Sequence, residues 1–533
     1  MKRFILNLLL AVPVLLSAQT ATTRIEKNLT VFTDVMRQLD MNYFDTLNYD
    51  RMTEEAIRAM LRQVDPYTIY IPKEQNTDLK IMTTGRYGGI GALIMMRDSM
   101  IYIAEPYEGM PAQRNDVRAG DCLVKVDNFV CAGQPTKEVS NRLRGEAGTV
   151  VRLTLKREGV AKPFTVDVER DEIRLPAIPY SYVVETDKDG QTPRIGYVLF
   201  SEFTTGSAMA LYSRLLEMDM QNDPRCSLVL DLRGNGGGLI DEAIKLVSLF
   251  VDKDTEVVTT KGMIASSNRS YKTTTSPTFS KMNVVVLVDG STASAAEIVS
   301  GSLQDLHRAT VIGERTFGKG LVQSIRPIAY GGNLKVTTAH YYLPSGRCIQ
   351  AIDYAPQQRG EKLERDTAGG ILPDIVLTDS QKVDICYALT RDRLFFDYAT
   401  RFRNRHASIA PPWDGAQGSA FEVTDDMVDD FLTFLDEKKY VYQTETSLFM
   451  KRLRELADME DLDPVSLQLI DSLQSTLQPS YHMAVMKHKD EVKRLLGADI
   501  VERYYFQKGR IAYMLRDDKA LLRAVEYVHS QQP

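Results

Sequence analysis

The stretch "VVVLVDGSTASAAEIVSGS", Val284 to Ser302, joins two patterns that together indicate an α/β fold. Its first part, Val284 to Val288, is a continuous apolar run of strand length, typical of a buried strand. From Ala295 onward, small and apolar residues recur at helical spacing. The stretch therefore predicts a buried strand that leads directly into a helix, with Ser294 at or near the helix N-terminus.

Two interpretations of Ser294 compete. Ser294 and Glu297 have the S-x-x-E spacing of a capping box, in which the serine closes the helix start. Alternatively, the hydroxyl acts chemically, because free backbone N–H groups and the positive end of the helix dipole would stabilise an oxyanion there. Taken alone, the stretch favours the cap.

Outward from this stretch, the 533-residue chain is too long for one core and divides into regions of different pattern. Residues 175–378 alternate apolar strands such as "CSLVLDLRG" with amphipathic helices, which is the α/β pattern. Residues 84–174 hold short strands and glycine turns, whereas residues 19–83 and 379–533 have helical spacing. The sequence therefore predicts a strand-rich domain and an α/β core between two helical regions.

The first residues, "MKRFILNLLLAVPVLLSAQT", have the pattern of an export signal. Lys2 and Arg3 precede an apolar segment too short to span a membrane comfortably, and Ser17 and Ala18 form a small-residue end. We expect residues 1–18 to be a signal peptide cleaved near Ala18, and the protein to be exported, with the periplasm as its compartment. An uncleaved N-terminal anchor is the alternative.

Charge and cysteine content argue against several classes of protein. The formal net charge is −6 and no long basic run occurs, so nothing points to a nucleic-acid partner. Five cysteines, scattered from Cys122 to Cys386, are too few for a disulfide scaffold and lack the spacing of a zinc site. We interpret all five as buried small apolar residues, and we expect neither a metal ion nor a cofactor.

A serine nucleophile needs a base within hydrogen-bond reach, and histidine is the first candidate. His307 lies more than three helical turns beyond Ser294, too far along the helix to touch it. His340 lies in the strand-like segment "KVTTAHYYL" and stays open as a base. Neither a G-x-S-x-G elbow nor an S-x-x-K motif occurs in the chain, so a Ser-His-Asp triad is disfavoured.

Lysine is the remaining type of base, and "GERTFGKGLVQ" supplies Lys319 between two glycines, which allow a tight turn. The following "LVQSIRP" is strand-like, so we expect Lys319 and Gln323, four residues apart, on one face, where Gln323 can hold the amine. A lysine base must be neutral. Lowering its pKa from about 10.4 to about 8 costs on the order of 3 kcal/mol, which burial can supply.

The same segment offers a rival interpretation. "GERTFGKG", Gly313 to Gly320, nearly matches the phosphate-binding pattern G-x-x-x-x-G-K-[ST], but Gly320 stands where the magnesium-binding hydroxyl residue belongs. A phosphate-binding loop must also lead into a helix, whereas this one leads into a strand-like run. We therefore expect no nucleotide.

A set of motifs in fixed order resembles the C-terminal processing peptidases, tail-specific serine proteases with a Ser-Lys dyad, from about Asp40 to Thr378. The motifs are "DLRGNGGG", "STASAAEI", "QDLHRA", "TFGKGLVQ", "YYLPSGR" and "GILPDI". The resemblance implies a multidomain protein with an α/β protease core of ClpP/crotonase-like βαβ units at 175–378. It further implies an inserted PDZ-like domain at 84–174 and helical N- and C-terminal regions.

The resemblance also implies roles for individual residues. Ser294 matches the nucleophile, Lys319 the general base, and Gln323 the residue that orients the lysine. The oxyanion hole would be built from the backbone N–H groups of Ala295 and Gly237. Departures from the family's pattern leave the dyad untouched; they are Thr292, Ala296 and Gly236.

Within the PDZ-like domain, "YGGIGA" resembles a carboxylate-binding loop. The N–H groups around Gly89 and Gly91 would face a chain terminus, while Ile90 lines an apolar pocket. A substrate tail would add as an extra strand beside this loop. The expected partners are therefore protein or peptide substrates with apolar C-terminal tails.

The function implied is that of a serine endopeptidase of the C-terminal processing type. The alternative is a catalytically silent PDZ-bearing binding or scaffold protein. A resemblance to retinoid-binding relatives of the same core is disfavoured by the intact Ser294, Lys319 and Gln323. A homo-oligomer and an adaptor protein both stay open as further partners.

Overall fold

The computed structural model describes residues 23–184, 194–220, 222–356, 361–366, 368–377, 384–413, 420–477 and 480–531. The predicted signal peptide and the predicted boundary between residues 378 and 379 lie outside these ranges. The chain forms two compact units, one up to Tyr70 and one from Ile71 onward. Within the described residues, no helix is both long and apolar enough to cross a membrane.

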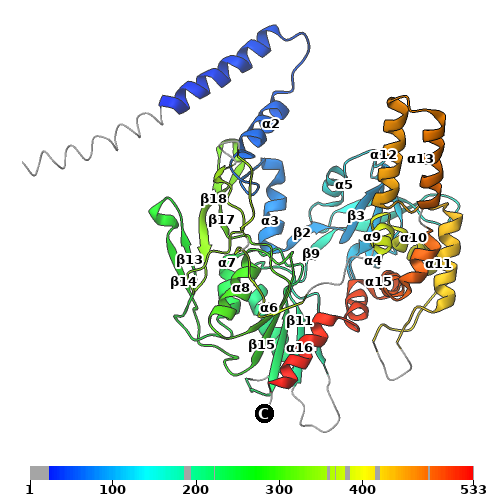
Figure 1. The fold of residues 1–533 in the computed structure, drawn as a ribbon. Coiled ribbons are helices and arrows are strands. Elements are labelled where there is room, and N and C mark those ends of the chain that lie inside the picture. The colour runs from blue at the N-terminus through cyan, green and yellow to red at the C-terminus, as the bar shows by residue number, and fades with distance from the viewer. Residues whose placement is uncertain are drawn as a thin grey trace, which may run out of the picture. The chain divides into compact units, whose positions relative to one another are not determined.

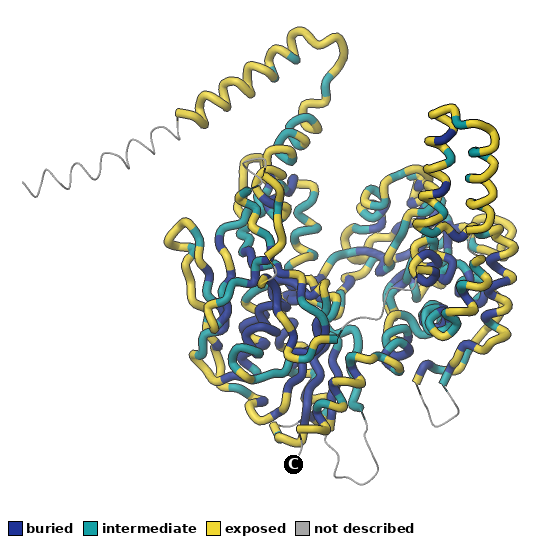
Figure 2. The backbone as a smooth tube through the Cα atoms, in the orientation of Figure 1, coloured by how far each residue is buried: buried dark blue, intermediate teal, exposed yellow. Residues whose placement is uncertain are grey.

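The N-terminal unit is helical, as its apolar spacing indicates. One helix covers residues 23–42, and α2 spans Tyr49–Leu61. The side chain of Asn48 accepts a hydrogen bond from the N–H of Arg51 and so caps the start of α2. In the first helix most side chains are exposed, including Leu29 and Phe32 (Figure 2).

The second unit begins with the 3₁₀ turn η1 (Lys73–Gln75) and α3 (Asn76–Thr84), followed by the PDZ-like domain. The domain's elements are β2 (Arg86–Gly89), β3 (Ala92–Arg97), β4 (Met100–Pro106), α4 (Pro111–Arg114), β5 (Cys122–Val126), β6 (Phe129–Val130), α5 (Thr136–Leu143), β7 (Val150–Lys156), β8 (Phe164–Glu169) and β9 (Asp171–Arg174). Its main sheet has the order β3-β4-β5-β7-β8, so β3 lies at an edge. Ile101, Leu123 and Leu153 are fully buried in its core.

The α/β core alternates strands and helices, as predicted. Its elements are β10 (Tyr180–Val184), β11 (Arg194–Leu199), α6 (Ser207–Glu217), β12 (Cys226–Asp231), α7 (Ile240–Val247), β15 (Asn283–Val288), α8 (Ala295–Asp305), β16 (Thr310–Gly313) and β19 (Ile375–Val376). The sheet order is β10-β11-β12-β15-β16-β19, with β11 to β19 parallel. The opening stretch thus forms β15 and α8, at the centre of this sheet (Figure 1).

Both faces of this sheet are covered, which explains the continuous apolar runs of its strands. Alternate residues such as Leu228 and Val286 face α6, α7 and α8. The intervening residues, such as Val229 and Leu287, share a second cluster with the C-terminal helix α16 (Lys519–Ser530). In Figure 2 these strands form the densest buried part of the molecule.

A second sheet in the core carries the lysine-bearing segment. Its elements are β13 (Glu256–Lys261), η2 (Ala265–Ser267), β14 (Arg269–Lys272), β17 (Leu321–Pro327), η3 (Ala329–Gly331) and β18 (Asn333–Tyr342). The antiparallel pairing runs β17-β18-β13-β14. Lys319 precedes β17 rather than lying within it.

The C-terminal region is helical. Its helices before α16 are α9 (Asp384–Arg391), α10 (Leu394–Arg405), α11 (Asp425–Glu437), α12 (Glu445–Met459), α13 (Pro464–Leu477), α14 (Tyr481–Lys487) and α15 (Lys489–Leu515). The side chain of Thr424 accepts a hydrogen bond from the Met427 N–H at the start of α11, while Phe431 and Leu435 are fully buried. These residues agree with the periodicity seen in the sequence.

The PDZ-like domain packs against this helical region. A Cβ atom on Gly120, in the turn before β5, would lie 2.4 Å from the Thr400 Cγ2 atom of α10. Arg97 of β3 forms an ion pair of 2.5 Å with Asp397, also on α10. The contact is therefore close enough to require a glycine at position 120.

Candidate active site

Ser294 lies in the sharp turn between β15 and α8. Its backbone angles are φ 58° and ψ −117°, a region that costs a side-chain-bearing residue about 1–3 kcal/mol. The residue is 7% exposed and occupies the N-cap position of α8. Strain at a strand-to-helix turn that presents a serine is the geometry of a nucleophile elbow, formed here without the G-x-S-x-G sequence.

Ser291, three residues before Ser294, does not cap α8. Ser291 is exposed, and its N–H donates to the carboxylate of Asp289 at 2.9 Å, within the loop that precedes the helix. Ser294 itself occupies the N-cap position, and its N–H donates to Glu297 Oε2 at 2.8 Å, which is the reciprocal half of a capping box. The capping and the chemical interpretation of Ser294 are therefore compatible.

Glu297 joins the serine turn to the lysine segment. Its Oε2 atom accepts the N–H of Ser294 and the N–H of Lys319, each at 2.8 Å. Its Oε1 atom accepts the Gly318 N–H at 2.7 Å and the Thr316 hydroxyl at 2.5 Å. Burial raises the pKa of Glu297, and these four hydrogen bonds oppose that rise. The sequence marked Glu297 only as part of a capping box and did not indicate this bridge.

Lys319 sits in an environment that favours its neutral amine. Burial lowers the pKa of Lys319, the positive charge of Lys335 lowers it further, and the carboxylate of Glu297 acts in the opposite direction. Lys335 lies on β18, and burial lowers its own pKa as well. Lys319 is thus half-buried, which is less than full burial, and the neighbouring cation was not foreseen.

The argument that placed Gln323 and Lys319 on one strand face is wrong. The strand begins at Leu321, so the alternation of side chains does not extend back to Lys319, and the β17–β18 register shifts between Val322 and Gln323. The side-chain amide of Gln323 donates to the Leu321 carbonyl at 3.0 Å. Its role toward the lysine remains a prediction.

The glycine turn after β12 lies directly against the serine. A Cβ atom on Gly237 would come within 2.8 Å of both the Ser294 Cβ and the Ala295 N, and the residue has φ 96°. Its N–H donates to Asn235 Oδ1 at 2.8 Å. The structure therefore brings Gly237, Ser294 and Ala295 together, with the Gly237 N–H engaged by an internal acceptor.

Tyr341 is a site residue that the sequence did not reveal. Its phenol lies beside the side chain of Ser294; burial raises the pKa of this phenol, and the neighbouring serine side chain opposes the rise. His340, the base left open above, is exposed and precedes Tyr341 on β18, so it points to the opposite face of the strand. No local pattern could place Tyr341 beside Ser294, because the contact joins two different sheets.

The predicted peptide-binding residues line a groove of about 440 Å³ in the PDZ-like domain. Gly89, Ile90 and Gly91 form one end of it, and the edge strand β3 and helix α5 form its walls. An unpaired strand edge beside a helix is the place where an extended peptide adds as a further strand. Arg144, at the end of α5, also lines the groove and forms an ion pair of 2.6 Å with Asp78 of α3.

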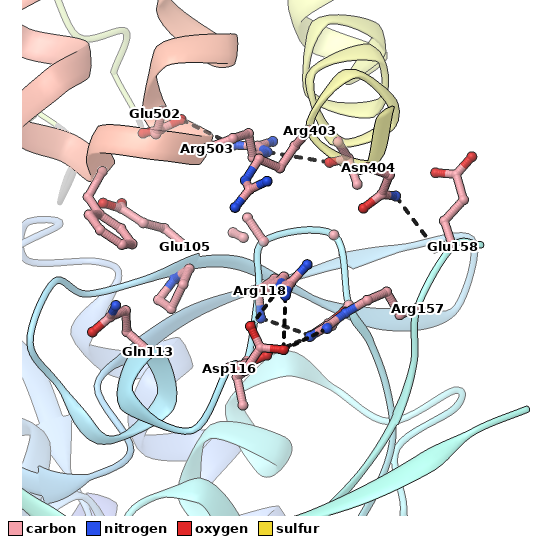
Figure 3. A pocket seen from close by; sticks show the side chains of 18 residues that line it. Glu105, Gln113, Asp116, Arg118, Arg157, Glu158, Arg403, Asn404, Glu502 and Arg503 are labelled. Atoms are coloured by element: carbon pink, nitrogen blue, oxygen red, sulfur yellow. Dashed lines mark hydrogen bonds and ion pairs between the residues drawn. The ribbon is translucent and has the colours of Figure 1, made fainter. Parts of the chain in front are cut away.

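A different cavity, of about 140 Å³, lies between the PDZ-like domain and the helical region (Figure 3). Its charged side chains bond mainly to one another: Arg157 pairs with Asp116 at 3.0 Å, and Arg118 pairs with the same carboxylate at 2.7 Å. Asn404 of α10 bonds to the Glu158 carbonyl at 3.4 Å. Since no residue of the α/β core lines this cavity, we assign it to the domain interface rather than to the active site.

Within the described residues, no group of three or more histidine, cysteine, aspartate or glutamate side chains could hold a metal ion. All five cysteines are free, and four are buried, whereas Cys348 is half-buried.

Three family models match successive parts of the chain. Residues 194–376 match "Peptidase family S41", residues 102–157 match "PDZ domain", and residues 385–528 match "Probable PDZ-protease, C-terminal helical domain". A carboxy-terminal-processing protease of Bartonella bacilliformis is 35% identical over 359 residues, covering 66% of this chain and 80% of that protein. The chain belongs to the carboxy-terminal-processing proteases of peptidase family S41. The resemblance carried by the sequence motifs is thereby confirmed, and the protein is a serine-type peptidase with a PDZ domain.

Other relatives are more distant. A "Probable CtpA-like serine protease" of Staphylococcus aureus is 32% identical over 337 residues, covering 62% of this protease and 64% of that protein. Among solved structures, the photosystem II D1 C-terminal processing protease is 27% identical, with 65% and 86% coverage and a TM-score of 0.38. The PDZ domain of a Vibrio cholerae carboxy-terminal protease, solved with a peptide, is 30% identical, with 17% and 99% coverage and a TM-score of 0.16.

Proposed function

We propose that this protease cleaves peptide bonds with a Ser294–Lys319 dyad and uses its PDZ domain to capture the C-terminus of the substrate. The observation that carries the proposal is the single buried carboxylate of Glu297, which binds the backbone N–H groups of both residues. Family membership does not favour the alternative of a catalytically silent scaffold.

In the proposed reaction, the Ser294 Oγ atom attacks the carbonyl carbon of the scissile bond, and its proton passes to the neutral Lys319 Nζ atom. The oxyanion that forms accepts hydrogen bonds from the N–H of Ala295 and the N–H of Gly237, which leaves Asn235 for this purpose. The carbon–nitrogen bond breaks, and the lysine returns its proton to the leaving amine. Water then hydrolyses the acyl-enzyme, again with the lysine as base.

Two side chains support the nucleophile and the base in this scheme. Tyr341, whose phenol lies beside Ser294, holds the serine side chain within its strained turn. Gln323 orients the lysine amine, which requires its amide to turn from the Leu321 carbonyl that it now contacts. Burial and the charge of Lys335 keep the amine deprotonated at lower pH than a free lysine.

The substrate enters through the PDZ groove. An apolar C-terminal tail would pair with the free edge of β3, its side chain would contact Ile90, and its carboxylate would face the backbone N–H groups around Gly89 and Gly91. We also propose that the protease is exported and acts in the periplasm, on the strength of the N-terminal signal pattern. Cell fractionation with N-terminal sequencing tests this placement, and an intact Met1 in the cytoplasm would contradict it.

Variants of the dyad test the reaction. Ser294→Ala and Lys319→Ala are each expected to lower kcat at least about 10³-fold while the protein stays folded, because each removes a group needed in the covalent step. Ser291→Ala, on the exposed part of the same turn, is the matched control and should retain activity. Peptide hydrolysis, followed by mass spectrometry, measures the activity of each variant. An active, purified Ser294→Ala protein would refute the proposal.

The terminus of the substrate tests the capture step. Peptides with a free carboxylate should be cleaved with lower KM than the same peptides with an amidated C-terminus. Tail binding without turnover by the wild-type protease would instead support the scaffold alternative.

A further inference from the structure

The last helix of the chain covers one face of the catalytic sheet. Leu521, Ala524 and Val528 of α16 are buried in one cluster with alternate residues of β11, β12, β15 and β16. The sheet residues of this cluster are Ile195, Tyr197, Val229, Val285, Leu287 and Ile312. In Figure 1, α16 lies beside β11 and β15, and the turn after β15 leads to Ser294 at the start of α8. The C-terminal helix is therefore part of the catalytic core, although it belongs to the helical region in sequence.

Asp518, the N-cap residue of α16, makes two kinds of contact. Its Oδ1 atom accepts the Leu521 N–H at 2.8 Å, which closes the first turn of the helix. Both carboxylate oxygens also accept hydrogen bonds from Arg233 Nη1, at 2.9 and 3.2 Å. One side chain thus both starts the helix and reaches the end of β12.

Arg233 is held from its other side by Asp231, the last residue of β12. The Nε and Nη2 atoms of Arg233 donate to Asp231, at distances from 2.6 to 3.1 Å. Tyr197 donates its hydroxyl to the same carboxylate at 2.7 Å. Because the side chains of Arg233 and Asp518 are only 25% and 20% exposed, the pair is shielded from much of the screening that weakens surface ion pairs.

The residues that follow Arg233 lead directly to the serine. The carbonyl of Asn235 accepts the Ala293 N–H at 2.9 Å, and its side chain accepts the Gly237 N–H. Gly237 in turn lies against Ser294 and Ala295 so closely that no Cβ atom fits. A movement of Arg233 would therefore be transmitted within a few residues to the predicted oxyanion donor.

We propose that Asp518 is a positioning residue for catalysis: from the C-terminal helix it holds Arg233, and through Arg233 it holds the loop of residues 234–238 that presents the Gly237 N–H. The inference rests on the proposed function, because it assigns a role in forming that oxyanion hole. Because Asp518 contacts Arg233 and the start of α16 rather than Ser294 or Gly237, we expect its effect to fall on the transition state rather than on peptide binding.

Two substitutions separate this role from helix capping. Asp518→Asn keeps a strong N-cap but removes the charge that pairs with Arg233. Asp518→Glu keeps the charge but is a poor N-cap. If the contact with Arg233 matters, kcat falls about 10- to 100-fold in Asp518→Asn with KM unchanged, and it stays within about threefold of wild type in Asp518→Glu. If capping alone matters, kcat falls more in Asp518→Glu than in Asp518→Asn, and the proposal is overturned.

A second readout detects the oxyanion hole itself. A peptide boronate forms a tetrahedral adduct with a nucleophilic serine, and its affinity should fall in Asp518→Asn by the same factor as kcat. Affinity for the unmodified peptide, measured in a Ser294→Ala background, should not change. Equal losses in both affinities would show a general structural defect and contradict the proposal.

The controls use the full chain. Glu526→Gln changes another acidic residue of α16, one that pairs with Arg523 at the surface, and should behave like wild type. Arg233→Gln should lower kcat as Asp518→Asn does, and the double variant should be no worse than Arg233→Gln alone. An active Ser294→Ala protein would refute the proposed function. If Ser294→Ala is inactive but Asp518→Asn is fully active, only the role of Asp518 is refuted.

Discussion

Glu297 is the residue at which the serine turn and the lysine segment meet. Its two oxygens accept four hydrogen bonds in a fully buried position, from the turn before α8 and from the segment before β17. A buried acceptor of this kind fixes both segments, since each donor left without a partner costs about 1–3 kcal/mol. Ser294, by contrast, carries backbone strain that its neighbours must maintain.

Replacing Glu297 by glutamine is expected to reduce both stability and turnover. An amide has one acceptor oxygen, so its NH₂ group would face donor groups from which Glu297 now accepts hydrogen bonds. We expect the free energy of unfolding to fall by about 1–3 kcal/mol and kcat to fall more than about 10-fold. Urea titration and peptide hydrolysis measure the two effects.

Glu242→Gln is the matched control for this variant, because Glu242 is also buried but its carboxylate binds the Ala208 N–H and Lys245 rather than Ser294 or Lys319. It should lose stability and keep kcat. Full activity of Glu297→Gln would show that the bridge does not position the dyad.

Lys335 offers a prediction on pH dependence. Burial lowers the pKa of Lys319, and the positive charge of Lys335 lowers it further. Lys335→Met removes that charge, so the pKa of Lys319 should rise and a smaller fraction of the amine should be neutral at a given pH. The rising limb of kcat/KM, measured between about pH 6 and about pH 10, should therefore move to higher pH.

The exposed Lys281 provides the control. Lys281→Met changes the net charge equally, but Lys281 acts on Asp223 rather than on Lys319, so the rising limb of kcat/KM should stay in place. If the rising limb of kcat/KM does not move in Lys335→Met, Lys319 is not the titrating base.

At the scale of elements, β3 and α5 form the walls of the groove in the PDZ domain. The free edge of β3 supplies main-chain hydrogen-bonding groups, and α5 supplies the opposite wall of the groove, with Ser140 among its lining residues. The sequence indicated the loop at one end of this groove but not its walls. Those depend on sheet order, which places β3 at an edge.

Filling the groove should impair capture but not chemistry. Ser140→Phe introduces a ring where the substrate tail would lie, and we expect KM to rise about 10-fold or more for peptides with a free C-terminus while kcat is retained. Steady-state kinetics with free and amidated peptides measure this difference. Glu138→Phe, two residues earlier on α5 and outside the groove lining, should leave KM unchanged. Equal KM values for wild type and Ser140→Phe would contradict tail capture in this groove.

At the scale of the whole molecule, the C-terminal region packs against two parts of the second unit. Thr400 of α10 packs against Gly120 of the PDZ domain, and α16 covers the sheet of the core. The region therefore packs against both the PDZ domain and the core. Removing its last helix would expose a continuous apolar face of the catalytic sheet.

Two neighbouring leucines of α16 test this placement. Leu521 is 3% exposed and packs on the sheet, whereas Leu522 is 50% exposed. We expect Leu521→Ala to lower the free energy of unfolding by about 2–5 kcal/mol and Leu522→Ala to have little effect. Thermal or urea unfolding of the two variants makes the comparison. Equal losses of unfolding free energy would show that α16 does not pack on the sheet through Leu521.

The sequence by itself determined the strand-to-helix passage at Ser294, the α/β pattern around it, the helical ends and the family, because these depend on local periodicity, turn residues and ordered motifs. It marked Lys319 and Gly237 as well, although the strand argument for Gln323 failed since β17 begins only at Leu321. Only the tertiary structure showed the Glu297 bridge, the Tyr341 contact and the Asp518–Arg233 pair. Each of these joins elements that are distant in the chain, and such contacts arise from how sheets and helices pack, which no local spacing records.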